Sequence, residues 1–224
     1  MRSIHLIVLA ALLLYLVPSC SQKPQEKQEP GKTEAKPRDK TPVKTILFFG
    51  NSLTAGYGID EEDAFPALIQ DRIDSLGMDY RVINAGLSGE TTASGLSRLD
   101  WFLEEAPEVF VLELGGNDGL RGISLEETRK NLKAIISQVR EKYPETSLVL
   151  AGMQIPPNMG PDYSAGFQNM YTEISAATGV VLIPFLLEGV AGDPELNLPD
   201  GIHPTEEGHQ LVAETVWEYL EPLL

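Results

Sequence analysis

Short apolar runs alternate with longer amphipathic stretches along most of the chain. Five runs are rich in Val, Ile, Leu or Phe on both faces, at residues 45–49, 80–83, 109–114, 147–151 and 180–184. Runs that are apolar on both faces are typical of parallel strands buried between layers of helices. Because these strands alternate with helices, the pattern predicts an α/β fold, a three-layer α/β/α sandwich with right-handed crossovers.

Two of the intervening stretches have a clear helical period. The first begins at Ser124, which can form a capping box with Glu127, and its apolar face contains Leu125, Leu132, Ile135, Ile136 and Val139. The second follows Thr205, and its apolar stripe contains Leu211, Val212, Val216 and Leu220. In an open α/β sheet the ligand site lies at the carboxyl ends of the strands. Polar residues directly after a strand are therefore the first candidates for chemistry.

The first 20 residues have a different pattern. Arg2 precedes an almost wholly apolar run at residues 4–17, which ends in Val-Pro-Ser-Cys at Cys20. An apolar run this short, with one basic flank, predicts a signal peptide rather than a membrane span. Its last four residues resemble a bacterial lipobox, so we expect a lipid on Cys20 and a lipid-anchored location in the bacterial cell envelope. The alternative is a plain signal peptide and a soluble periplasmic protein.

Residues 21–44 are rich in Lys, Glu, Gln and Pro and predict a flexible tether. One domain remains, at residues 45–224, with nine basic and 29 acidic residues, whereas the tether carries seven basic and four acidic ones. A domain with a net charge of −20 is not expected to bind nucleic acid or to adhere tightly to anionic lipid. We therefore expect contact with a membrane only through the N-terminal anchor. We also expect a monomer.

Cysteine content excludes several kinds of site. Cys20 is the only cysteine, so the chain has no intrachain disulfide and no multi-cysteine zinc or iron–sulfur site. A cysteine that is lost with a signal peptide or carries a lipid cannot serve as a catalytic thiol. Thiol chemistry is excluded on the same ground.

Four polar segments follow predicted strands or precede the last helix, at residues 50–54, 84–91, 115–118 and 200–204. Ser52 in the first is a candidate nucleophile at a strand-to-helix turn, although a serine there can also be a helix cap. Gly86 and Gly89 in the second permit close approach of backbone N–H groups, or form a simple glycine turn. Asn117 in the third can donate its amide to an oxyanion, or belong to an ordinary turn.

The fourth segment offers a general base. Asp200 and His203 are three residues apart, so one short loop can present a carboxylate and an imidazole together. The chain has three histidines, and His5 leaves with the signal peptide, so a histidine base is His203 or His209. His209 lies inside the last helical pattern, which favours a helix-face or capping role.

The ordered set of four segments resembles the SGNH (GDSL-type) hydrolases over about residues 46–224. The segments at 56–58, 116–122 and 154–158 are similar to the bacterial thioesterase I/lysophospholipase/arylesterase branch. The resemblance implies a flavodoxin-like, mostly parallel sheet of about five strands. It also implies hydrolysis of carboxylic esters, and of thioesters, through an acyl-enzyme, with no metal and no organic cofactor.

The resemblance also implies a role for each residue. Ser52 would be the nucleophile, and Asp200 and His203 would complete the catalytic triad. The backbone N–H groups of Ser52 and Gly86 and the side-chain amide of Asn117 would form the oxyanion hole. The family's first block usually reads Gly-Asp-Ser, and this chain has Asn51 instead of the Asp. Asparagine keeps the shape and one acceptor oxygen, so we expect the activity to survive.

The substrate is predicted less directly. An envelope location favours aryl or alkyl esters, or lysophospholipids, over acyl-CoA. The loop at residues 156–163 could line an acyl pocket with Pro157, Met159 and Tyr163, or could be a proline-rich turn that covers the sheet edge. A carbohydrate O-acetylesterase and a catalytically silent, ligand-binding lipoprotein are the alternatives. A deep apolar groove beside Ser52 would favour the first interpretation, and a shallow polar one would favour the acetylesterase.

Overall fold

The computed structural model describes residues 43–224, which contain the predicted domain. The predicted signal peptide, Cys20 and nearly all of the tether lie outside the described residues. None of the helices in the described part of the chain is both long and apolar enough to cross a lipid bilayer.

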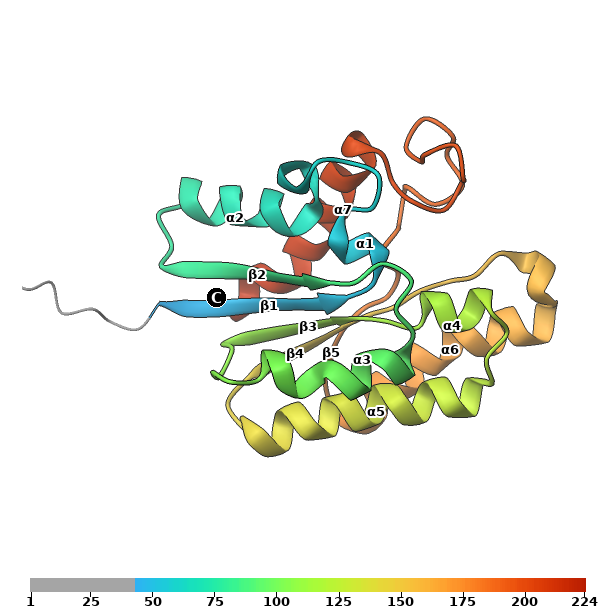
Figure 1. Cartoon of the computed structure of the whole chain (residues 1–224), viewed down its shortest axis with the longest axis horizontal. Helices are drawn as coiled ribbons and strands as arrows, with labels where there is room; N and C mark the ends of the chain where they lie inside the picture. Colours follow the sequence, from blue (N-terminus) through green and yellow to red (C-terminus); the bar gives the residue numbers. More distant parts are fainter. Residues whose placement is uncertain (1–42) are drawn as a thin grey trace, which may run out of the picture. The chain divides into compact units, whose positions relative to one another are not determined.

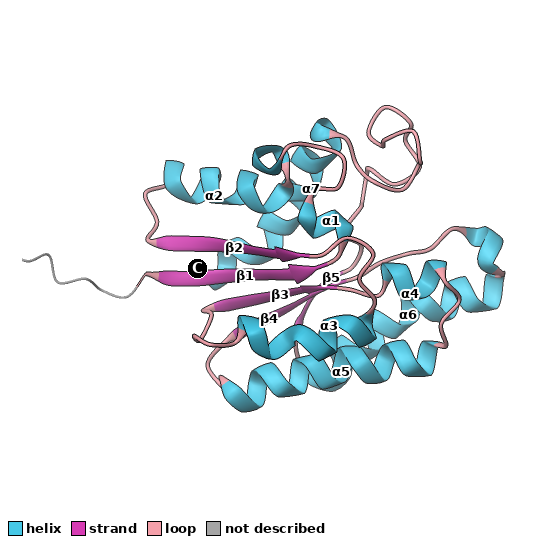
Figure 2. Ribbon diagram, in the orientation of Figure 1, coloured by secondary structure: helices cyan, strands magenta, loops and turns pink. Residues whose placement is uncertain are grey.

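The centre of the domain is a five-stranded sheet in which every neighbouring pair is parallel (Figures 1 and 2). The strand order is β2-β1-β3-β4-β5, with bounds β1 (Lys44–Gly50), β2 (Tyr80–Gly86), β3 (Val109–Glu113), β4 (Ser147–Ala151) and β5 (Val181–Ile183). The α/β sandwich predicted from the apolar runs is therefore confirmed. The chain runs from β1 to β2 on one side and then returns to β3 on the other. This reversal makes the carboxyl ends of β1 and β3 the switch point where ligands bind in such sheets.

Helices cover both faces of the sheet (Figure 1). One face carries α1 (Ser52–Ala55), α2 (Phe65–Ser75) and α7 (Glu206–Leu220). The other carries α3 (Thr92–Arg98), α4 (Gly116–Leu120), α5 (Leu125–Lys142) and α6 (Pro161–Thr178). Four 3₁₀ turns complete the described elements: η1 (Glu61–Asp63), η2 (Leu99–Phe102), η3 (Pro157–Met159) and η4 (Glu221–Leu223).

The core forms because the central strands are apolar on both sides. In β1, four consecutive side chains are buried: Ile46, Leu47, Phe48 and Phe49. Phe48 meets Phe65 of α2 edge-on at 5.4 Å on one face, and Phe49 stacks on Phe110 of β3 at 5.7 Å. Aromatic pairs of this kind add to the burial of apolar area. Phe48 thus anchors α2 to the sheet, whereas Phe49 joins β1 to the neighbouring strand β3.

Capping residues begin the two helices predicted from the sequence. Ser124 accepts a hydrogen bond from the backbone N–H of Glu127, and Thr205 accepts one from Gly208, so both helix starts lie where they were predicted. The apolar stripe of α7 was partly wrong, because Leu211 is exposed. At about 100° per residue it lies off the face formed by Val212 and the residues four and eight positions later.

A buried ion pair holds the loop that follows β2. The guanidinium of Arg98 binds the carboxylate of Glu90 and donates to the carbonyl oxygens of Ala85, at 2.7 Å, and Gly50, at 3.3 Å. The same guanidinium lies over the ring of Phe49, 4.3 Å from its centroid. Arg98 therefore connects the carboxyl ends of β1 and β2 to the loop between β2 and α3.

Candidate active site

Ser52 is the first residue of α1, immediately after β1. The side chain of Asn51 accepts a hydrogen bond from the backbone N–H of Leu53 at 3.0 Å and so caps the helix. Gly56 ends α1 with φ +71°, a left-handed conformation that glycine adopts without strain. This tight turn places the Ser52 hydroxyl at the switch point, with its backbone N–H at the positive end of the helix.

A hydrogen-bonded relay joins Ser52 to the loop before α7. The Nε2 atom of His203 lies 2.9 Å from the Ser52 Oγ, and its Nδ1 atom lies 2.7 Å from Oδ2 of Asp200. The hydrogen bond from the His203 ring lowers the pKa of Asp200 to about 2, so the carboxylate stays ionised near neutral pH. An ionised Asp200 keeps the proton of the neutral ring on Nδ1 and leaves Nε2 free to accept from the serine.

Backbone contacts fix the loop that carries the base. Asp200 Oδ1 accepts from the backbone N–H groups of Ile202, at 2.9 Å, and His203, at 3.1 Å. The His203 carbonyl in turn accepts from the N–H of Leu198 at 2.7 Å. The ring of Tyr57 packs against the imidazole with 4.5 Å between centroids. These contacts leave His203 little freedom to turn away from Ser52.

Of the residues predicted to supply the oxyanion hole, Gly86 is the one whose structure differs from the expectation. The Asn117 amide comes from α4 and donates to the Glu90 carbonyl at 3.0 Å, beside the reactive turn. Gly86 does not offer a free N–H, because it donates to Oδ1 of Asn84 at 2.9 Å. Its lack of a side chain serves packing, since a Cβ there would lie 2.3 Å from the Ala55 nitrogen.

Gly89, three residues later, has the features that Gly86 lacks. It lies in the loop before α3 with φ +81°. Arg121 donates to its carbonyl oxygen at 3.0 Å, which fixes the orientation of the loop. Its N–H has no hydrogen-bond acceptor among the described residues. Of the two glycines that the sequence offered, Gly89 is the one with an available donor.

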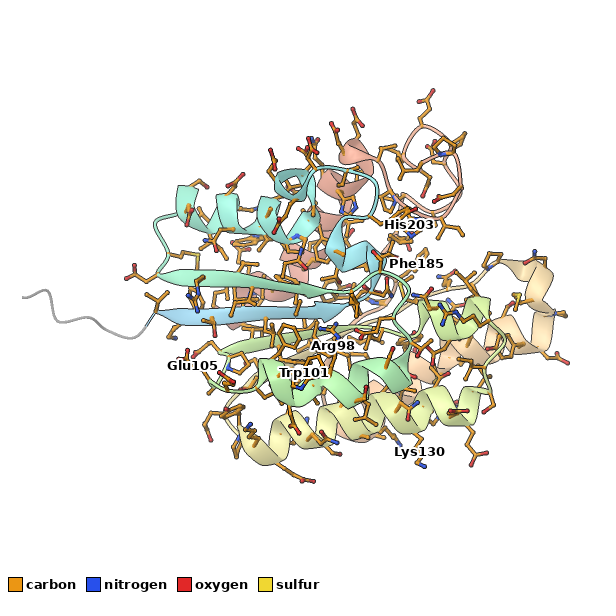
Figure 3. The ribbon with its side chains drawn as sticks, viewed as in Figure 1. Arg98, Trp101, Glu105, Lys130, Phe185 and His203 are labelled. Carbon is orange, nitrogen blue, oxygen red and sulfur yellow. The ribbon has the colours of Figure 1, made fainter. Side chains whose placement is uncertain are left out.

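A cavity of about 560 Å³ opens beside Ser52. Most of the side chains that line it are apolar, including Leu120, Met153, Ile155, Pro156, Phe185 and Leu187. His203 and Phe185 lie toward the carboxyl ends of the strands (Figure 3). Ser52, Asn117 and His203 line the same cavity, so the hydroxyl of Ser52 lies beside its apolar walls.

Comparison with known proteins agrees with this geometry. The family model of GDSL-like lipases/acylhydrolases matches residues 48–211. The chain belongs to this GDSL-like family. The resemblance predicted from the four segments is therefore confirmed, and with it an enzyme that acts on ester bonds.

Several relatives of this GDSL-like enzyme are esterases. It is 42% identical to "Esterase TesA" of Pseudomonas aeruginosa over 81% of this chain and 90% of the relative. It is 35% identical to "Thioesterase 1/protease 1/lysophospholipase L1" of Escherichia coli K12, over 80% and 85%. A crystal structure of the psychrotrophic esterase EstA from Pseudoalteromonas sp., inhibited by monoethylphosphonate, superposes with a TM-score of 0.76 at 35% identity. That match covers 80% of this chain and 97% of EstA.

Two of the three substrate-binding residues predicted for this GDSL-like enzyme are not among the residues that line the cavity. Met159 and Tyr163 are absent from the lining, and the Tyr163 hydroxyl donates to the Ile123 carbonyl at 2.6 Å. Pro157 begins η3, and its side chain lies outside the part of the structure that is described. The cavity instead uses the residues just before η3, together with the segment after β5. The apolar residues Met153 and Ile155, directly after β4, were the pattern that could have indicated this.

Glu113 is a buried acidic residue of the GDSL-like enzyme that the sequence pattern concealed. It ends β3 within an otherwise apolar run and is 1% exposed. Its carboxylate accepts hydrogen bonds from Asn51 and Thr54, on either side of the nucleophile. A lone carboxylate inside a buried strand is costly unless it is hydrogen-bonded. That cost is the physical reason to look for its partners.

Proposed function

We propose that the protein is a serine esterase that hydrolyses carboxylic esters through an acyl-enzyme. The relay of Ser52, His203 and Asp200 at the mouth of an apolar cavity is the observation that carries this proposal. Family membership and the esterases among its relatives support the same reaction type. Each of the three residues has a defined task in that reaction.

In the first half of the reaction, the Ser52 Oγ attacks the acyl carbonyl carbon and its proton passes to Nε2 of His203. Asp200 stabilises the imidazolium that forms. The tetrahedral oxyanion accepts hydrogen bonds from the N–H groups of Ser52 and Gly89 and from the Asn117 amide. When the intermediate collapses, His203 gives the proton to the leaving alcohol, and the acyl group stays on Ser52.

In the second half, His203 takes a proton from water, and the resulting nucleophile attacks the acyl-enzyme. The same donors stabilise the second oxyanion, and its collapse releases the acid and returns the proton to Ser52. Every proton transfer in both halves passes through Nε2 of His203, which lies 2.9 Å from the Ser52 Oγ.

The cavity supports aryl or alkyl esters with an apolar acyl group, and lysophospholipids, as the substrate class. Its apolar lining, from Leu120 to Phe185, suits a hydrocarbon chain better than a sugar. This feature favours the esterase over a carbohydrate O-acetylesterase. A ligand-binding protein without turnover is disfavoured because it would not require the aligned relay. Thioester cleavage uses the same attack and is part of the proposal.

Two measurements test the proposal. Ser52→Ala should lower kcat/KM for p-nitrophenyl butyrate by about 10⁴-fold or more, because no other group can carry the acyl intermediate. A folded variant that kept a tenth of the wild-type rate would exclude Ser52 as the nucleophile.

Initial rates on acetyl, butyryl and octanoyl esters should rise with acyl length, and a clear preference for acetyl would instead support the acetylesterase.

The proposal extends to the location of the enzyme. A lipidated Cys20 would anchor the protein in the bacterial envelope, and the basic segment at residues 21–44 would connect it to the acidic domain. The short apolar run with a basic flank and the lipobox-like end support this placement. The domain is also proposed to work as a monomer, because Ser52, His203 and Asp200 of a single chain complete the relay.

A further inference from the structure

Glu113 is enclosed by hydrogen-bond donors from the nucleophile turn. Its Oε2 accepts from the backbone N–H of Asn51 at 3.0 Å and from the Thr54 hydroxyl at 2.9 Å. Its Oε1 accepts from the side-chain amide of Asn51 at 2.6 Å. A Cβ on Gly50 would lie 2.6 Å from Oε2, so the glycine leaves room for the carboxylate. The carboxylate thus binds both ends of the short segment that contains Ser52.

Asn51 passes this constraint to the nucleophile. A carboxylate only accepts hydrogen bonds, so the Asn51 NH₂ group must face Glu113 and its oxygen must face away. That oxygen accepts from the backbone N–H of Leu53 at 3.0 Å and lies 3.3 Å from the Ser52 Oγ. The amide therefore connects the buried carboxylate to the first turn of α1, which carries Ser52, while the single proton of the Ser52 hydroxyl faces His203.

We propose that Glu113 is a positioning residue which, through Asn51, holds the Ser52 hydroxyl and N–H in their reactive orientation. The inference rests on the proposed esterase function and assigns no contact with substrate to Glu113. Asn51 is the matched partner, because an amide satisfies an ionised Glu113 where a second carboxylate would oppose it. An Asp at position 51, as in the usual Gly-Asp-Ser block, would have to share a proton with Glu113. Asn51 needs no such proton, because its amide donates directly to the Glu113 carboxylate.

The other charged and titratable groups near Glu113 form their hydrogen bonds with other partners, not with its carboxylate. The Tyr171 hydroxyl of α6 donates to the Leu114 carbonyl at 3.0 Å, and Arg98 of α3 donates to the Gly50 carbonyl. Asp118 of α4 is bound by Thr92, and His203 binds Ser52. Within residues 43–224, the hydrogen bonds of the Glu113 carboxylate all come from Asn51 and Thr54. Burial raises its pKa to about 7, which agrees with a carboxylate that lacks a cationic partner.

Exchanging donor and acceptor between the two positions tests the proposal. In Glu113→Gln, the new NH₂ group must face either the Asn51 amide or the Asn51 N–H and Thr54 hydroxyl, so donor opposes donor. We expect kcat to fall by about tenfold or more, with KM changed by less than about threefold. A purely structural role would lower the amount of folded enzyme without this split between kcat and KM.

The companion variant Asn51→Asp has a different signature. Two carboxylates at hydrogen-bond distance must share a proton, as in other carboxylate pairs. This variant should be active near neutral pH and lose activity as the pH rises and the shared proton leaves. The wild type, which needs no such proton, should show no loss over the same range. The pH profile therefore distinguishes the two ways of holding the turn.

The double variant Asn51→Asp/Glu113→Gln restores complementary groups with their roles exchanged. The NH₂ group of the introduced glutamine would donate to the introduced aspartate. The oxygen of the same glutamine would accept from the backbone N–H at position 51 and from the Thr54 hydroxyl. We expect kcat within about threefold of the wild type and no loss of activity at high pH. Multiplicative losses, or an Asn51→Asp variant with the wild-type pH profile, would overturn the proposal.

A matched control is Glu108→Gln, which removes an exposed carboxylate that pairs with Lys44 at 2.8 Å, far from the turn. It should leave kcat, KM and the pH profile unchanged. Thermal unfolding of all four variants shows whether each one is folded. If wild type and Glu108→Gln do not hydrolyse esters, the proposed function has failed. If both are active and the double variant does not recover, only the role of Glu113 has failed.

Discussion

The two histidines of the domain use their ring nitrogens in opposite ways. His203 engages both of them in the relay between Asp200 and Ser52. His209 is buried, accepts a hydrogen bond from the Phe65 N–H at 3.1 Å through Nδ1, and stacks on the Phe65 ring. His209 thus lies on the buried face of α7, one of the two roles predicted for it, and its Nδ1 atom contacts the first residue of α2.

Substituting each histidine by alanine should separate these roles. His203→Ala removes the proton acceptor and should lower kcat/KM for p-nitrophenyl butyrate by about 10⁴-fold, with the melting temperature nearly unchanged. His209→Ala should lower the melting temperature and leave kcat/KM of the folded enzyme within about threefold, because it does not contact the relay. The reverse ranking, in folded proteins, would show that the base had been misassigned.

Individual residues differ in how far the sequence could identify them. Ser52, Asp200 and His203 could be predicted because few chemically competent residues follow the strands, and only two histidines remain in the domain. The sequence could not show whether Gly86 or Gly89 supplies the oxyanion-hole N–H, because the answer depends on the Asn84 side chain, which accepts the hydrogen bond of Gly86. Glu113 was concealed because an apolar run predicts a buried strand but does not reveal the partners of its one charged residue.

At the scale of elements, His209 joins α7 to the start of α2. Burial lowers the pKa of His209 to about 4 from an ordinary value of 6.5. A proton on Nδ1 would also oppose the Phe65 N–H that now donates to it. The folded state therefore favours the neutral ring, and the stabilising contact is fully present above about pH 6.5. As the pH falls toward 4, the unfolded chain binds the proton more readily and stability is lost.

The size of this effect can be measured with His209→Asn, whose amide oxygen can still accept from the Phe65 N–H. Wild type should lose about 3 kcal/mol of unfolding free energy between pH 6.5 and 4 that the variant does not lose. Urea unfolding of both proteins at several pH values gives this difference. The raised pKa of Glu113 has the opposite effect, since it makes the folded protein more stable as the pH falls below 7. This contribution is the same in both proteins, so it cancels in the comparison. Parallel pH curves would contradict the role of His209.

The elements themselves were predicted well where a single physical cause determines them. Each of the five apolar runs became a strand of the sheet, because burial on both faces requires continuous apolar sequence. Loops after the strands were harder, since the cavity lining depends on how separate loops meet. Met153 and Phe185 lie 32 positions apart in the sequence and line the same cavity, whereas the nearby Tyr163 binds a carbonyl elsewhere.

For the whole domain, the direction of β1 separates the site from the end where the chain enters. Lys44 begins β1 and binds Glu108 at the amino edge of the sheet, while Ser52 follows β1 at the carboxyl edge (Figure 1). Seven residues of strand span roughly 20 Å. The chain before residue 43 therefore joins the domain at the edge of the sheet opposite to the active site.

A chain that begins at Val43, after an initiator methionine, tests this separation. It keeps Lys44 and every described contact of the relay, and it contains no cysteine, so folding needs no disulfide. Its kcat and KM for p-nitrophenyl butyrate should stay within about twofold of the full-length protein, because the deleted segment joins the sheet roughly 20 Å from Ser52. The full-length protein should sediment with membranes, and Cys20→Ala, which keeps the tether, should release it without a change in kcat. A large fall in kcat/KM on deletion would show instead that the N-terminal segment takes part in the site. Sedimentation of Cys20→Ala with the membranes would show that attachment does not depend on a lipid at that cysteine.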